Sequence, residues 1–138
     1  MENKAVITPL LPDPLSAFHP HARITGDFIY VSGLISRNLE GLHGVTLSPE
    51  GSVVSYDIEI QTRVIFENLE KILKEAGSSL AHVIDVSVFL TSIEKDFKSF
   101  NKVYGEIMGD ICPCRTTVEV SRFPSPVQIE IKCIALRS

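Results

Sequence analysis

The side chains best suited to chemistry in this chain are an arginine and a glutamate near its carboxyl end. Arg115 opens the run Arg-Thr-Thr-Val-Glu-Val, and Glu130 lies in the middle of the apolar run from Val127 to Leu136. A planar guanidinium offers a carboxylate two parallel hydrogen bonds. A carboxylate within hydrogen-bond reach can move protons between water and a reacting group, especially where partial burial raises its pKa. This pair of side chains would suit the binding of a small acid and the activation of water.

Two histidines and a glycine add to these candidates. His19 and His21 can carry protons near neutral pH or line a polar cleft. Gly33 follows an apolar run, and a residue without a Cβ lets a ligand approach the main chain of Ser32 and Gly33 closely.

The cysteines indicate no metal chemistry. There are three of them, at positions 112, 114 and 133, and Cys-Pro-Cys lacks the two-residue spacing of a zinc or redox pair. We expect free thiols and no metal site.

Composition places the chain among intracellular globular proteins. Its 138 residues fit one domain spanning 1–138, with 44% hydrophobic and 22% charged residues. A net charge of -4 without a basic cluster argues against nucleic acid as a partner. Without a signal-like amino terminus or a run of 18 apolar residues, we expect a cytoplasmic protein that does not enter membranes.

The elements that position these residues follow from hydrophobic spacing. Short strands are expected at 5–8 and 28–32, the second stopping at Gly33, and the first 22 residues otherwise form a proline-rich lead-in. Residues 36–55 carry turn signals and predict a surface loop or small hairpin. Amphipathic spacing then predicts the remaining elements, which are a helix over 57–76, a strand over 83–90, a helix from the cap residue Ser92 to Gly109, and strands over 115–121 and 127–136.

This order predicts an α+β fold: a two-layer sandwich in which two helices cover one face of a mixed β-sheet. The other face remains for water, a ligand or another subunit. Alternation along the last strand puts Gln128, Glu130 and Lys132 on that second face, and Asp85 and Ser87 share a face with Val83 and Phe89. A tight hairpin before the last strand would place Glu119 opposite Glu130.

Six motifs occur in order along nearly the whole chain, from about Ala17 to the end. They are Gly26-Asp-Phe-Ile-Tyr-Val-Ser-Gly33, Gln61-Thr-Arg-Val-Ile-Phe-Glu-Asn-Leu69, Val86-Ser-Val-Phe-Leu90, Phe100-Asn-Lys-Val-Tyr104, Pro113-Cys-Arg-Thr-Thr-Val-Glu-Val120 and Ile129-Glu-Ile-Lys-Cys-Ile-Ala135. This set resembles the RidA (YjgF-like) family of imine and enamine deaminases. The resemblance implies a chorismate-mutase-like fold, a homotrimer with clefts between neighbouring subunits, and a reaction without a cofactor.

Two segments most resemble the 2-aminomuconate deaminase branch of that family, namely Ala17–His21 and Ser32–Arg37. The family pattern has a tyrosine near the position of His19 and a cysteine at the position of Thr117. Both departures favour a specialised relative over a general imine deaminase.

The resemblance also implies roles for individual residues. Arg115 matches the arginine that holds the substrate carboxylate, and Glu130 matches the acid that handles the attacking water. Because 2-aminomuconate has carboxylates at both ends, Arg37 is a candidate for the second one. The remaining residues expected to bind substrate are Ser32, Gly33, Asn101, Thr117 and His19.

The leading hypothesis is a homotrimeric hydrolase that converts 2-aminomuconate to the oxo acid and ammonia. One alternative is a broad-specificity RidA-type deaminase of 2-imino acids. Another is a trimer that binds small carboxylic acids without catalysis, although such binding needs no water-activating acid. A ribonuclease activity, suggested for relatives, is disfavoured by the acidic composition.

Overall fold

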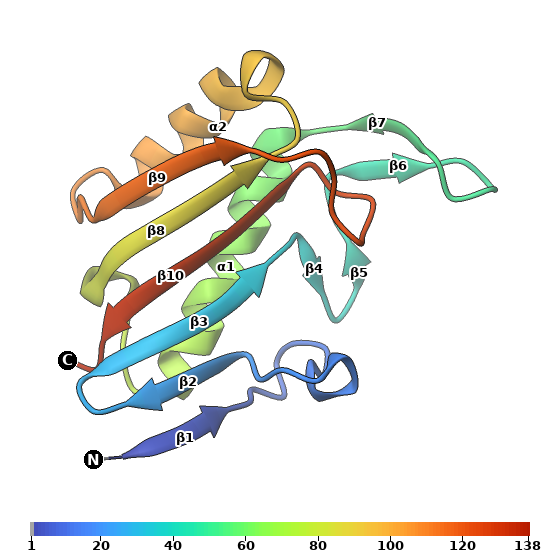
Figure 1. The fold of residues 1–138 in the computed structure, drawn as a ribbon. Coiled ribbons are helices and arrows are strands. Elements are labelled where there is room, and N and C mark those ends of the chain that lie inside the picture. Colours follow the sequence, from blue (N-terminus) through green and yellow to red (C-terminus); the bar gives the residue numbers. More distant parts are fainter. Residues whose placement is uncertain (1) are drawn as a thin grey trace.

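Residues 2–138 are described by a computed structural model, and they form two layers (Figure 1). One layer is a six-stranded sheet with the order β1-β2-β3-β10-β8-β9, in which β8 and β9 are parallel and all other neighbours are antiparallel. Its strands are β1 (Asn3–Val6), β2 (Ala22–Thr25), β3 (Phe28–Leu34), β8 (Val83–Leu90), β9 (Cys114–Glu119) and β10 (Ile129–Leu136). Two helices form the other layer, so the expected α+β class is confirmed.

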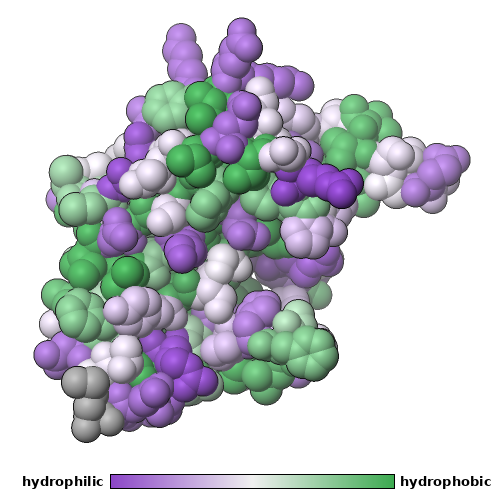
Figure 2. All heavy atoms as spheres, viewed as in Figure 1, coloured by the Kyte–Doolittle hydropathy of each residue, from purple (hydrophilic) through white to green (hydrophobic). Residues whose placement is uncertain are grey.

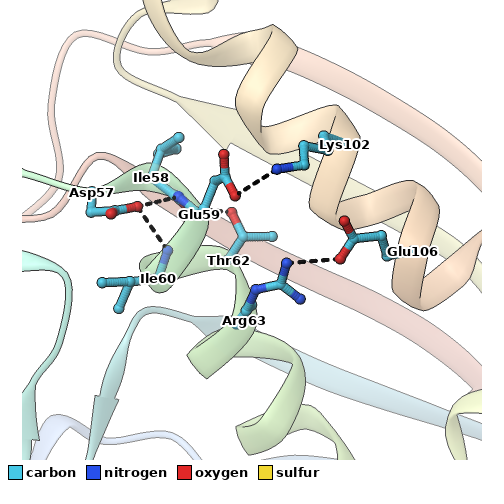
Figure 3. Close-up of polar contacts among 8 residues, drawn as sticks. All are labelled: Asp57, Ile58, Glu59, Ile60, Thr62, Arg63, Lys102 and Glu106. Carbon is cyan, nitrogen blue, oxygen red and sulfur yellow. Dashed lines mark hydrogen bonds and ion pairs between the residues drawn. The ribbon is translucent and has the colours of Figure 1, made fainter.

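The helices are α1 (Ile58–Glu75), which is capped by Asp57, and α2 (Ile93–Met108), which begins at the expected cap residue Ser92. The carboxylate of Asp57 accepts hydrogen bonds from the main-chain N–H groups of Glu59 and Ile60 (Figure 3). The hydroxyl of Ser92 accepts one from the N–H of Lys95. Each cap satisfies N–H groups that the first turn of a helix leaves unpaired.

Two ion pairs join the exposed sides of the helices (Figure 3). Arg63 Nη2 lies 2.7 Å from Glu106 Oε2, and Lys102 Nζ lies 3.4 Å from Glu59 Oε1. Exposed pairs of this kind contribute about 0–1 kcal/mol each. The apolar layer beneath the helices therefore contributes most of the packing energy.

That apolar layer lies between α1 and the middle of the sheet. Ile129, Ile131 and Cys133 of β10 are buried, as are Ile72 and Leu73 of α1. Burying a side chain of this size contributes about 1.5–3 kcal/mol. The intervening residues of β10 point to the opposite, open face of the sheet. Figure 2 shows apolar and polar side chains interspersed on the visible surface.

The expected orientation of Gln128 is wrong. Gln128 lies outside β10, which begins only at Ile129, and it is buried. Its side-chain oxygen accepts a 2.6 Å hydrogen bond from Gln61 of α1, and its main-chain N–H donates to the Gln61 side chain. Strand alternation does not extend to a residue that precedes the strand.

The expected pairing of Glu119 with Glu130 is also wrong. β8 lies between β9 and β10, so Glu119 stands beside Leu90 and Glu130 beside Phe89. Glu119 accepts a hydrogen bond from the N–H of Ile93 at the start of α2. The negative Glu119 carboxylate therefore lies at the amino-terminal end of α2, where the helix dipole is positive, and stabilises that end.

Val83 does not share the face of Asp85, as simple alternation indicated. The register of β8 against β10 shifts between the pairs Ile134–Asp85 and Ala135–Val83. This bulge places an extra residue, Ile84, in β8 and turns Val83 into the core, where it is 3% exposed.

The 36–55 segment, expected as a surface loop or small hairpin, holds four short strands, and a further sheet strand, β2, was not expected. β2 follows the lead-in and pairs with β3 through the turn at Gly26–Asp27. The 36–55 segment forms two hairpins, β4 (Arg37–Asn38) with β5 (Gly41–Leu42) and β6 (Val45–Leu47) with β7 (Val53–Tyr56). The β6–β7 hairpin projects from the body of the molecule (Figure 1). No helix within residues 2–138 is long and apolar enough to cross a membrane.

Candidate active site

Glu130 lies at a defect in the sheet that brings its carboxylate against Gly33. The pairs Ile131–Leu34 and Cys133–Val31 show that β3 has one more residue than β10 at this point. The bulge means that β3 does not stop at Gly33, as expected, but continues to Leu34. A Cβ built on Gly33 would lie 2.6 Å from Glu130 Oε2. A residue with a Cβ at this position would have to displace the Glu130 carboxylate, which occupies that space.

The environment of Glu130 favours the protonated carboxyl more than water does. Burial raises the pKa of the Glu130 carboxyl above its ordinary value, and the charge of nearby His19 partly opposes this shift. A carboxyl with a raised pKa is better able to exchange protons near neutral pH.

Glu130 opens onto two adjoining hollows. The first has a volume of about 320 Å³ and the second about 530 Å³, and His19, Gly33 and Glu130 line both. Leu11, Leu34 and Phe123 contribute apolar walls to the first hollow, and we call it the Glu130 cavity. Its volume suits a small organic molecule.

The two histidines differ in their freedom to carry a proton. His19 Nδ1 lies 3.0 Å from the carbonyl oxygen of Pro20, which can only accept, so Nε2 is left to take a proton. His21 is 5% exposed and uses both ring nitrogens: Nδ1 accepts from Thr8 N–H, and Nε2 donates to Pro12 O. His21 therefore holds the lead-in segment in place through both ring nitrogens.

Ser32 also ties the lead-in to the sheet beside the cavity. Its hydroxyl donates to Pro20 O over 2.7 Å, and its main-chain N–H donates to His21 O over 3.0 Å. These bonds hold His19 at the mouth of the cavity. They also mean that the Ser32 groups already have partners within the chain.

Arg37 lines the Glu130 cavity from β4. Its main-chain oxygen accepts a 2.8 Å hydrogen bond from the amide of Asn68, a buried residue of α1. The Asn68 amide also donates to Ile35 O, and its own oxygen has no partner among residues 2–138.

Arg115 lies on an aromatic surface of α2. Its guanidinium carbon is 4.7 Å from the ring centre of Tyr104 and 5.7 Å from those of Phe97 and Phe100. Nη1 donates a 2.7 Å hydrogen bond to Asn101 Oδ1. Cation–π contact and this bond fix the direction of the guanidinium.

The structure does not bring Arg115 and Glu130 together within one chain. Arg115 stands beside Val86, a fully buried residue, and so lies on the helix-covered face of the sheet. Glu130 lies two strands away on the open face. Thr117 shares the face of Arg115, and its buried hydroxyl has no hydrogen-bond partner in the described part of the chain. The expected site residues thus form two groups, Glu130 with Gly33, Ser32, His19 and Arg37, and Arg115 with Asn101 and Thr117.

Sequence reasoning missed several residues of the Glu130 cavity. Asn68 had a signal, since it is a polar residue on the buried side of an amphipathic helix, between Phe66 and Leu69. Leu11 and Phe123 lie in proline-rich connections, where neither alternation nor helical spacing indicates a direction. Within residues 2–138 no cluster of His, Cys, Asp or Glu side chains is arranged to hold a metal ion.

The fold and this cavity define a class: a two-layer α+β protein with a small cavity, walled by apolar side chains and holding a carboxylate, beside the open face of its sheet. Comparison with known proteins agrees. The family model described as Endoribonuclease L-PSP matches residues 10–137. A RutC family protein of Pyrococcus abyssi is 37% identical over 138 residues, covering 99% of each chain. The chain therefore belongs to the RutC family, the RidA or YjgF-like proteins.

Solved structures extend the match to three dimensions. A putative endoribonuclease of Thermotoga maritima has a TM-score of 0.82 at 33% identity, covering 100% of this chain and 99% of that one. TdcF of E. coli, solved with bound serine, has a TM-score of 0.79 at 28% identity, with 98% of this chain and 99% of that chain covered. Membership of the family supports a role in imine deamination or small-molecule binding.

Proposed function

We propose that the chain is a cytoplasmic deaminase that hydrolyses the imine form of a small carboxylic acid, with Glu130 as the group that moves protons. The observation that carries this proposal is the half-buried Glu130 carboxylate, held against Gly33 and facing a cavity of about 320 Å³.

The reaction requires two proton transfers that one carboxylate can perform. An enamine substrate first tautomerises to the imine. Water then adds to the carbon of C=N while Glu130 takes one of its protons, and the proton passes to nitrogen. Glu130 then takes the remaining hydroxyl proton and passes it to the nitrogen as the C–N bond breaks. Ammonia leaves and the carbon becomes a carbonyl, so that imine and water give oxo acid and ammonia. His19 Nε2 is placed to assist at the mouth of the cavity.

We infer that Arg115 supplies the carboxylate-binding half of the site from a neighbouring subunit. Arg115 and Glu130 lie on opposite faces of the sheet, so a cleft that uses both needs two copies of the chain. A homotrimer with three such clefts fits this requirement, because a head-to-tail interface closes into a ring. Asn101 and Thr117 would then accompany Arg115 in each cleft.

For the substrate we propose 2-aminomuconate. The segments Ala17–His21 and Ser32–Arg37, which resemble that branch of the family, both contribute to the Glu130 cavity. The bound serine of the E. coli relative supports a small amino acid-like carboxylate as the general ligand. A broad-specificity 2-imino acid deaminase and a non-catalytic carboxylate-binding trimer are the alternatives.

The test is ammonia release from enzymatically generated 2-aminomuconate and 2-aminoacrylate. Faster turnover of 2-aminomuconate by the wild type, lost in Glu130→Gln, is the expected result. Comparable rates on both substrates would favour broad specificity, and inactivity on both would leave the binding role.

The family model is described as an endoribonuclease, but the net charge of -4 argues against RNA as the substrate of this chain.

A further inference from the structure

The Glu130 cavity contains an arginine that takes no part in the proton transfers of the proposed reaction. Arg37 lines this cavity. Arg115, by contrast, is proposed to bind the carboxylate next to the reacting carbon. Among the cavity's lining residues in the described chain, Arg37 is the one arginine or lysine. Its guanidinium makes no hydrogen bond or ion pair within residues 2–138. An arginine beside a cavity without an acidic partner is available to a ligand.

The backbone of Arg37 is fixed although its side chain is exposed. Asn68, which is 1% exposed, donates from its amide to the carbonyl oxygen of Arg37, and β5 pairs with Arg37 through Leu42. A guanidinium on an anchored backbone loses less freedom on binding than one on a mobile loop. The Asn68 contact thus preorganises this end of the cavity.

Other charges at the cavity do not replace Arg37. Asp13 and Glu130 are acids, and one Asp13 oxygen already accepts a hydrogen bond from the N–H of Leu15. Both ring nitrogens of His21 already have hydrogen-bond partners within the chain. His19 shares the mouth of the cavity with Glu130. Arg37 is therefore the permanent cation that a second anionic group would meet.

We propose that Arg37 binds a second carboxylate, at the far end of the substrate, and so selects extended dicarboxylic acids over monocarboxylic ones. The inference rests on the proposed use of this cavity as the substrate site and names the substrate class. The apolar walls formed by Leu11, Leu34 and Phe123 contact the hydrocarbon between the two carboxylates. A guanidinium recognises a carboxylate through two parallel charge-assisted hydrogen bonds, which lysine cannot reproduce.

The experiment compares two unreactive acids with the same six-carbon diene chain. trans,trans-Muconate has a carboxylate at each end, and sorbate has a carboxylate at one end and a methyl group at the other. Dissociation constants are measured by titration calorimetry for the wild type, Arg37→Met, Arg37→Lys and Arg122→Met. Arg122 is exposed, lies outside the cavity lining and supplies the matched loss of one positive charge.

Wild type and Arg122→Met are expected to prefer muconate to sorbate. In Arg37→Met this preference should fall roughly tenfold to hundredfold, because one charge-assisted bidentate contact is lost. Arg37→Lys should recover only part of it. An equal preference in Arg37→Met and wild type would overturn the proposal, as would an equal loss in Arg122→Met, which would indicate a general effect of charge.

These dissociation constants, taken together with the ammonia-release assay on the same variants, separate this inference from the proposed function. Arg37-dependent binding of muconate by a protein that releases no ammonia supports the dicarboxylate site and rejects the deaminase. Ammonia release with a substrate preference that is the same in wild type and Arg37→Met supports the deaminase and rejects the role of Arg37.

Discussion

At the scale of single residues, the position of Glu130 has a thermodynamic consequence. Burial disfavours the ionised carboxylate, and Gly33 leaves room for the group without offering it a side-chain donor. The folded chain therefore holds a charge that is better solvated when the chain is unfolded. Strain of this kind is expected where a group serves chemistry rather than stability.

Glu130→Gln should therefore stabilise the fold at neutral pH relative to wild type. Because the pKa of Glu130 is raised on folding, its contribution to stability is complete below the unfolded value of about 4.3 and is lost as pH rises through the folded value. Glutamine does not titrate. Urea unfolding at pH 4 and pH 7 should show the advantage of Glu130→Gln growing with pH. A variant that loses stability as pH rises would mean that the ionised carboxylate has a favourable partner.

At the scale of elements, the sequence predicted those with long periodic signals. Both helices were predicted from their apolar spacing, and the cap residue Ser92 marked the start of α2. β2 was missed because four residues show too few alternations between a proline-rich lead-in and a turn.

The order of the strands and the grouping of the site residues depend on contacts between segments far apart in the sequence. A local hydrophobic pattern does not record such contacts. The connection after β9 passes over β8 instead of forming a hairpin, so Glu119 and Glu130 do not pair. The bulge at Gly33 likewise arises from the register of β3 against β10. The candidate residues could be named from the sequence, but their separation into two groups on opposite faces could not.

Side-chain contacts join Tyr56, at the end of the β6–β7 hairpin, to α2: the Lys95 ammonium lies 4.9 Å from the centre of the Tyr56 ring, and the Tyr56 hydroxyl bonds to Asp96. The Tyr56 hydroxyl donates a 2.8 Å hydrogen bond to Asp96 Oδ2, and Asp96 is 4% exposed. Burial and this contact raise the pKa of Tyr56 to about 12. Tyr56→Phe should destabilise the fold by about 1–3 kcal/mol in urea unfolding, because a buried carboxylate loses its donor. Tyr30→Phe, at an exposed tyrosine of the open face, is the control, and an equal loss in both variants would contradict the anchoring role.

At the scale of the whole molecule, the separation of Arg115 from Glu130 bears on assembly. Arg115 faces α2, and Glu130 faces the open side of the sheet. Exposed aromatic side chains on that open side, Phe28 and Tyr30, are 40% and 47% exposed. A neighbouring subunit that covered them would remove apolar surface from water while completing the cleft.

Complementation between two inactive variants tests whether the cleft is shared. Arg115→Ala and Glu130→Gln should each be inactive and trimeric by light scattering, since neither residue belongs to the buried core. Co-expressed chains that mix at random should recover about a quarter of wild-type activity, because a cleft is intact only when each neighbour supplies its unaltered half. Separately purified variants mixed without subunit exchange are the control and should remain inactive. Mixed trimers without activity would reject the shared cleft, and a loss of the trimer in Arg115→Ala would make its role structural.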